Sequence, residues 1–134
     1  CSELDLVAAD VNGGKSVQIP TGVGFCMYIR RDCLDEVGLF DEESFGKGYG
    51  EENDFCLRAI DKGWKSILAA DTFVRNVGGS SFGYEKQDRV INAIRVINDR
   101  FPGYDREIQD FLYEDPIQIY RKNIDVARLN KKVE

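Results

Sequence analysis

The spacing of hydrophobic positions predicts two strand regions in the first part of the chain. Residues 19–29, IPTGVGFCMYI, form an apolar, β-prone run that is typical of a strand buried on both faces. Gly22 and Gly24 interrupt this run, and glycine inside a strand indicates close approach of another group. Residues 64–77 predict a second strand region, formed in pieces. Residues 1–16 have a mixed pattern that ends in the turn signal NGGK, so a loose entry segment is expected there.

Between the two strand regions, the pattern predicts short helices and a loop. The segment RDCLDEVGLFDE fits a short helix with Asp32 as its N-cap and Gly38 at its end. A glycine-rich loop follows at 46–50. Apolar residues at helical spacing then predict another helix, which ends at Lys62 and Gly63. The segment GGSSFG, 78–83, is a predicted loop.

From Glu85 onward the pattern is helical. Val90, Ile94, Ile97 and Phe101 recur at i, i+4, i+7 and i+11, which is the apolar stripe of an amphipathic helix. A break at 102–103 precedes a second helix, for which Asp105 is the expected cap, and a third helix is expected from Pro116 towards Leu129. Strands that alternate with helices and then give way to helices alone predict a mixed α/β fold. Two or three strands make a poor sheet by themselves, so part of the sheet is expected to lie outside this sequence.

Composition narrows the range of functions. The chain has 134 residues, enough for one domain, and carries 18 Lys and Arg against 24 Asp and Glu, a net charge of −6. This balance argues against a general nucleic-acid binder, which needs a basic face. No apolar run reaches the roughly 18 residues of a membrane span, and no signal peptide opens the chain.

Cysteine and histidine content bears on metals and disulfides. Histidine is absent and the four cysteines form no CxxC pair, so a zinc site of the usual type is not expected. Cys26 and Cys56 lie in apolar patterns. We therefore expect buried, reduced thiols of a cytosolic protein, with a disulfide framework as the alternative.

The stretch FGKGYGEENDFCLRAIDKGW, 45–64, places three glycines in five residues before Glu51 and Glu52. One interpretation is calcium binding, because Asp41, Gly46 and Glu52 match positions 1, 6 and 12 of an EF-hand loop, although Phe45 at position 5 offers no oxygen. A second is structural: acids in a first helical turn are stabilised by exposed amides and the helix dipole. The third is catalytic, because a carboxylate kept ionised at a helix start can accept a proton, and glycines in front of it allow a loop to close over a substrate.

The segment PTGVGFCMYIRRDCLDEVGLFDEESFGKGYGEENDFCLRAIDKGW resembles the acceptor-side half of family 2 glycosyltransferases, which have the GT-A fold. The later segment DTFVRNVGGSSFG is similar to the strand and loop that follow in the family, and NDRFPGYDREIQDFLYEDPIQIYR is similar to the helical extension of some bacterial members. Several motifs occur in the expected order over about residues 17–122. The resemblance implies a partial GT-A fold: a small mixed sheet with flanking helices in residues 1–84, and a C-terminal helical extension in 85–134 packed on it.

The resemblance also implies an activity and a set of site residues. Family members transfer a sugar from a nucleotide-sugar donor to an acceptor hydroxyl with inversion, and the acidic pair supplies the general base. Glu52 matches the base, with Glu51 as the alternative and as the residue that positions the acceptor. Implied substrate-binding residues are Thr21, Gly22, Tyr49, Gly50, Asp54 and Arg58. For Asp54 and Arg58, the alternative to substrate binding is an i, i+4 ion pair. For Thr21 and Gly22, the alternative is tight packing of a strand. Trp64 is interpreted as a core residue.

Two departures from the family pattern matter. The nucleotide-binding half, with its DxD motif for a divalent cation, does not occur in these 134 residues. Asn76 stands where relatives carry a histidine that ligates Mn²⁺ or Mg²⁺, and an amide oxygen is a weaker ligand for a transition metal. We therefore expect a fragment that is inactive alone. In the full enzyme the cation is held mainly by the missing DxD motif, or the site is poor in metal; an inactive relative is the other alternative.

Together, these features predict that the chain is part of a bacterial or archaeal glycosyltransferase of cell-surface polysaccharide or glycoconjugate synthesis. It would act in the cytoplasm, at the inner face of the membrane, on a nucleotide-sugar donor and a carbohydrate acceptor. Self-association is a further hypothesis, because apolar surface would be exposed where the other half should dock. The alternative is a non-catalytic carbohydrate-binding or protein-interaction module derived from the same fold.

Overall fold

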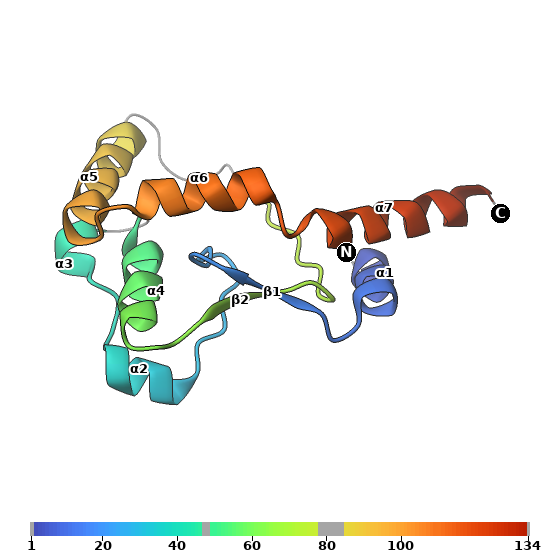
Figure 1. The fold of residues 1–134 in the computed structure, drawn as a ribbon, viewed down its shortest axis with the longest axis horizontal. Helices are drawn as coiled ribbons and strands as arrows, with labels where there is room; N and C mark the ends of the chain where they lie inside the picture. Colours follow the sequence, from blue (N-terminus) through green and yellow to red (C-terminus); the bar gives the residue numbers. More distant parts are fainter. Residues whose placement is uncertain (1, 47–48, 78–84, 134) are drawn as a thin grey trace.

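The computed structural model describes residues 2–46, 49–77 and 85–133 of the chain. Figure 1 shows the elements, a mixed α/β arrangement with helices flanking a small sheet. Their bounds are α1 Ser2–Asn12, β1 Ser16–Ile19, α2 Arg31–Val37, α3 Glu42–Phe45, α4 Glu51–Asp61, β2 Ser66–Ala69, α5 Glu85–Arg100, α6 Tyr104–Glu114 and α7 Gln118–Val133. The architecture is the partial GT-A fold that the sequence predicted. The predicted loop at 78–83 and Cys1 lie outside the described residues.

The sheet consists of two antiparallel strands, with Ser16 opposite Ala69 and Ile19 opposite Ser66. The prediction of a buried strand over 19–29 is wrong, because β1 ends at Ile19 and residues 20–30 are irregular. Pro20 has no N–H to donate to a ladder, and glycines within a strand weaken it. The second strand region, predicted over 64–77, is confirmed only at 66–69.

The irregular segment 20–30 also exposes apolar side chains that were expected to be buried. Val23 is 64% exposed, Phe25 55% and Tyr28 91%. Cys26 in the same segment is exposed, so its predicted burial is wrong, whereas Cys56 is buried with a free thiol as predicted. Burial raises the pKa of the Cys33 thiol, which is also free.

The N-terminal segment forms helix α1, so the expectation of a loose entry segment is wrong. Helix α1 packs against α7, from the opposite end of the chain (Figure 1). The Asn12 side chain, 1% exposed, joins three elements. Its Nδ2 donates to the carbonyls of Ala70 and Tyr120 at 3.1 and 3.2 Å, and its Oδ1 accepts from Asn123 Nδ2 at 3.0 Å. Contacts across more than a hundred residues override the weak local pattern.

Helix α4 lies at the centre of the core and buries two of its faces. Leu57 joins a cluster with residues of α3, α5 and α6: Phe45, Ala93, Ile97 and Tyr104. Phe55 and Ala59 join a second cluster with Cys33 and Val37 of α2. Trp64 packs against that second cluster, which confirms its interpretation as a core residue. Packing on both sides holds α4 in place between the two clusters.

The C-terminal helices α5, α6 and α7 confirm the three helices predicted from the sequence. Helix α5 packs against α3, α4 and α6. The caps differ from the prediction. Asp32 lies inside the first turn of α2, which follows Arg30, and Asp105 lies inside the first turn of α6, which follows Gly103. The division of the chain at residue 84 stays a prediction.

Candidate functional site

The start of helix α4 is set by a glycine that no other residue could replace without strain. Gly50 is the N-cap, with φ 91° and ψ −16°, in the left-handed region that disfavours residues with a side chain. A Cβ at this position would lie 2.8 Å from Ala93 Cβ and 2.9 Å from the Phe45 ring. The glycine therefore allows α5 and α3 to approach the helix start closely. The sequence interpretation of Gly50 as a substrate-binding residue stays a prediction.

Glu51 and Glu52 form the first turn of α4, and both are half-buried. They line a cavity of about 400 Å³ between the helix start and the irregular segment 20–30, which we call the loop cavity. The other residues of its wall are Val23, Gly24, Phe25, Met27, Ile29 and Phe40. A Cβ on Gly24 would lie 3.7 Å from Glu52 Oε1, so the bare backbone of this residue faces the carboxylate. Glu52 thus stands, with Glu51, at the wall of a cavity whose other side chains are apolar.

A second cavity of about 230 Å³, which we call the helix cavity, lies on another side of the same helix start. Its wall comes from Tyr49, Gly50, Glu52 and Asn53 around the start of α4, from Val90, Ala93, Ile94, Ile97 and Asn98 of α5, and from Tyr104 and Asp105 of α6. Glu52 lines both cavities. Tyr49, which the sequence proposed for stacking on an acceptor ring, lies in the wall of the helix cavity.

Thr21 and Gly22 are tied to the site through hydrogen bonds. The hydroxyls of Thr21 and Tyr104 are 2.8 Å apart, and Asn53 Nδ2 donates to the Tyr104 hydroxyl, also at 2.8 Å. The Gly22 N–H donates to Cys56 Sγ at 3.3 Å. Burial raises the pKa of Tyr104. The sequence analysis did not identify Tyr104, because nothing local indicates that its hydroxyl meets two segments so distant along the chain.

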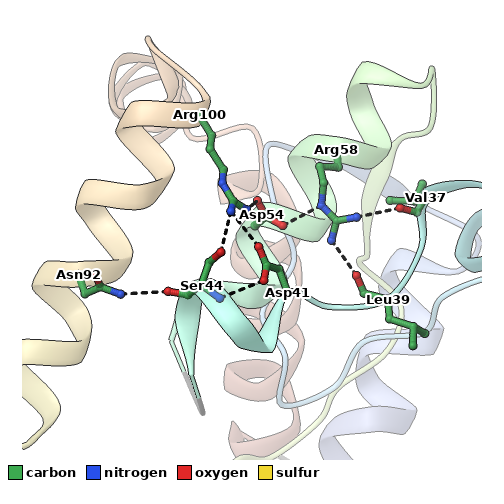
Figure 2. A network of polar contacts seen from close by, with 8 residues as sticks. All are labelled: Val37, Leu39, Asp41, Ser44, Asp54, Arg58, Asn92 and Arg100. Atoms are coloured by element: carbon green, nitrogen blue, oxygen red, sulfur yellow. Dashed lines mark hydrogen bonds and ion pairs between the residues drawn. The ribbon is translucent and has the colours of Figure 1, made fainter.

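Asp54 is fully buried and holds α4 in place through two arginines (Figure 2). Its Oδ2 accepts from Arg58 Nε and its Oδ1 from an Arg100 guanidinium nitrogen, each at 2.7 Å. Arg58 also donates to the carbonyls of Val37 and Leu39, at 2.8 and 2.9 Å. The i, i+4 ion pair offered for Asp54 and Arg58 is confirmed. Neither residue lines either cavity, so direct substrate binding by the pair stays a prediction.

Arg100 extends this network to α3. Its guanidinium donates to Asp41 Oδ2 and to Ser44 Oγ, both at 2.8 Å, and Asp41 Oδ1 accepts from the Ser44 N–H at 3.0 Å (Figure 2). Hydrogen bonds from Ser44, together with Arg100, lower the pKa of Asp41 to about 2. Asp41 is thus a helix cap and an ion-pair partner, and Phe45, at position 5 of the hypothetical calcium loop, is buried. This geometry does not favour the calcium interpretation.

Asn76 lies exposed in the segment after β2. Within the described ranges, no cluster of three or more Cys, Asp or Glu side chains is placed where it could hold a metal ion. The described residues therefore do not fit a divalent cation by themselves. No described helix has both the length and the apolar character needed to cross a membrane.

Comparison with known proteins agrees with this arrangement. The family model described as glycosyltransferase like family 2 matches residues 4–92, which is more than half of the chain. The match runs from α1 through both glutamates into the first half of α5. No curated protein and no solved structure matches the chain. The extent of the family match shows that this chain belongs to the glycosyltransferase-like family 2.

Proposed function

We propose that this chain is the acceptor-side half of an inverting glycosyltransferase, in which Glu52 is the general base. The observation that carries the proposal is the position of the Glu52 carboxylate. It is half-buried at the first turn of α4 and lines a cavity of about 400 Å³, a volume within the range of small-molecule sites. A base must come within hydrogen-bond reach of the proton it removes, and the loop cavity offers space for an acceptor hydroxyl beside the carboxylate.

In the proposed reaction, Glu52 removes the proton from the acceptor hydroxyl while its oxygen attacks the anomeric carbon of the donor. The new carbon–oxygen bond forms on the face opposite the bond to the nucleoside diphosphate, which breaks and leaves with its electron pair. The configuration of the anomeric carbon is thereby inverted. The neighbouring Glu51 is proposed to position the acceptor.

The irregular segment 20–30 supports this proposal. The Gly24 backbone lies against the Glu52 carboxylate, so this segment forms the side of the loop cavity next to the proposed base. The hydrogen bonds of Thr21 and Gly22 fix the beginning of the segment relative to α4 and α6. We propose that these two residues shape the acceptor pocket through backbone position.

The donor and the divalent cation belong to the proposal for the full enzyme. We propose that a nucleotide-sugar donor binds to parts of the enzyme outside this chain, in a cytoplasmic pathway of cell-surface polysaccharide synthesis. In the full enzyme, Mn²⁺ or Mg²⁺ would offset charge on the leaving diphosphate. Since the described residues do not fit the cation by themselves, parts of the enzyme outside this chain would hold it, with Asn76 as a weak additional ligand.

Exposed apolar side chains suggest an interface. Val23, Phe25 and Ile67 are each more than half exposed on the irregular segment and the sheet. We propose that they are covered by the other half of the enzyme or by a second copy of the chain. Light scattering after size-exclusion chromatography tests the second option, which a clean monomer would contradict.

The decisive experiment is Glu52→Gln in the full-length protein that contains this chain. Gln keeps the shape but cannot accept a proton, so we expect kcat to fall about 10²–10⁴-fold with little change in acceptor KM. Release of nucleoside diphosphate from a panel of nucleotide sugars measures turnover. Glu51→Gln is the matched control and should reduce kcat far less. Unchanged turnover in Glu52→Gln would refute the assignment.

The rival function is a carbohydrate-binding or protein-interaction module without chemistry. The specific observation in its favour is Asn76, which lies exposed and, among the described residues, is not grouped with a metal-binding cluster. This rival predicts that the full-length protein binds saccharides and transfers no sugar with any donor and either cation. Detectable sugar transfer by the wild-type full-length protein would refute this non-catalytic function.

A further inference from the structure

Just over half of the residues that line the helix cavity lie outside the family match. The match ends at residue 92, whereas Ala93, Ile94, Ile97 and Asn98 of α5 and the first turn of α6 follow it along the chain. The opposite wall contains Glu52, which also lines the loop cavity. Glu52, the proposed base, therefore lies between the loop cavity, whose wall is within the matched region, and the helix cavity, which α5 and α6 complete.

The wall of the helix cavity has an apolar side and a polar side. Ile94 and Ile97 of α5 supply aliphatic surface. Asn53, Asn98 and Asp105 supply amide and carboxylate groups, and Asn98 Nδ2 donates to Asp105 Oδ2 at 3.1 Å. Such groups offer both donors and acceptors. A sugar ring has the matching character, because its C–H faces are apolar and its edge carries hydroxyls that donate and accept.

The size of the cavity limits the ligand. About 230 Å³ is smaller than the roughly 300–1,000 Å³ of sites for drug-sized molecules. One ring fits this scale better than an extended chain does.

We propose that the helix cavity is a second saccharide subsite, which binds the acceptor ring next to the one whose hydroxyl reacts at Glu52. The inference rests on the proposed function, because it takes the loop cavity as the place of reaction. Asn98 and Asp105 then become specificity-determining residues, supplied by a segment that the family match does not include. An acceptor of two rings should bind more tightly than an acceptor of one ring.

Methyl groups of the chain provide a direct test by NMR. With ¹³C-labelled Ile δ1 and Met ε methyls, Ile94 and Ile97 report on the helix cavity, and Ile29 and Met27 report on the loop cavity. Ile67, exposed on β2, is the internal control. The probes are methyl glycosides of glucose, galactose, mannose and N-acetylglucosamine, with lactose and chitobiose as disaccharides.

We expect at least one disaccharide to shift the methyls of both cavities, and to bind more tightly than its monosaccharide. Asn98→Ala should weaken that disaccharide about tenfold, the effect of losing one good hydrogen bond, and Asp105→Ala should act in the same direction. Arg95→Ala is the matched control, because Arg95 is exposed on the same helix and does not line the cavity. An unchanged methyl spectrum without sugar shows that each variant is folded.

Three results would overturn the inference: no shift with any probe, shifts confined to Ile29 and Met27, or equal binding by Asn98→Ala and the wild type. Shifts confined to the loop cavity would leave the proposed function intact. Conversely, unchanged turnover in Glu52→Gln together with shifts at Ile94 and Ile97 would refute the catalytic role and retain the saccharide subsite. The two failures are therefore distinguishable.

Discussion

Helices α4 and α6 begin with the same local structure but have different surroundings. Each follows a left-handed glycine N-cap, Gly50 with φ 91° and Gly103 with φ 100°, and each has acidic residues in its first turn. A Cβ on Gly103 would meet nothing within 4 Å, whereas one on Gly50 would collide with Ala93 and Phe45. Close packing surrounds Gly50 at the start of α4, whereas the space beside Gly103 is open and only the neighbouring Tyr104 is buried.

The acids of the two helices differ in the same way. Asp54 is fully buried and bound by two arginines, whereas Asp105 is exposed and bonded to Asn98. The same residue type therefore anchors the fold at one helix start and lines a cavity at the other. A packed helix start can hold a carboxylate such as Glu52 in a fixed position, which is the condition that proton transfer requires.

The largest difference in stability should come from the two aspartates. Asp54→Ala leaves Arg58 and Arg100 without their shared carboxylate. We expect the unfolding free energy to fall by about 3–4 kcal/mol. The loss stays below that of a fully enclosed ion pair, because both arginines keep other hydrogen-bond acceptors. Asp105→Ala, at an exposed residue, should change it by about 0.5 kcal/mol or less. Urea denaturation measures both. Equal losses would show that the Asp54 network does not hold α4.

The two glycines provide the next comparison. Gly103→Ala adds only left-handed strain, about 1 kcal/mol. Gly50→Ala adds the same strain and overpacks the contact with Ala93 and Phe45, so a total loss of about 2–3 kcal/mol is expected. Thermal unfolding followed by circular dichroism measures the two losses. If Gly103→Ala lowers the stability as much as Gly50→Ala does, close packing does not distinguish the two helix starts.

The smallest expected effect is a pH dependence through Asp41. Its pKa in the folded chain is about 2, below the ordinary value of 3.8, so the ionised carboxylate stabilises the fold. This contribution is complete above about pH 4 and is lost as pH falls through about 2. Because solvent screens this partly exposed carboxylate, its contribution to the unfolding free energy is about 1 kcal/mol or less. Urea denaturation at pH 5 and pH 2 should show that Asp41→Asn loses less stability on acidification than the wild type, and identical losses would contradict the assignment.

The helical periodicity of the sequence predicted the C-terminal helices well. The stripe Val90, Ile94, Ile97 and Phe101 identified α5, but it did not predict that Ile94 would be half exposed at a cavity wall while Ile97 is buried. Periodicity reports which residues share a helix face. It does not report whether the neighbouring helix fills the space in front of them.

Local patterns failed where distant contacts decide the structure. Helix α1 was missed because its burial depends on α7 and on the hydrogen bonds of Asn12 to residues far along the chain. The run 19–29 was predicted as a strand because apolar residues dominate it, yet Pro20 and two glycines prevent a continued ladder. The pairing of Asp54 with Arg100 joins α4 to the end of α5, and no spacing rule predicts it.

The sequence by itself determined the chemistry available at the start of α4: a glycine-rich approach, two adjacent carboxylates, an i, i+4 pair of Asp54 and Arg58, and motifs of a glycosyltransferase family. Those properties are local, since they depend on residue type and on spacing along one helix. Only the tertiary structure decided that Glu52 stands between two cavities and that α5 and α6 complete one of them. Cavities form between elements that are distant in sequence, because their shape depends on how packed side chains leave space, and a one-dimensional pattern carries no record of that space.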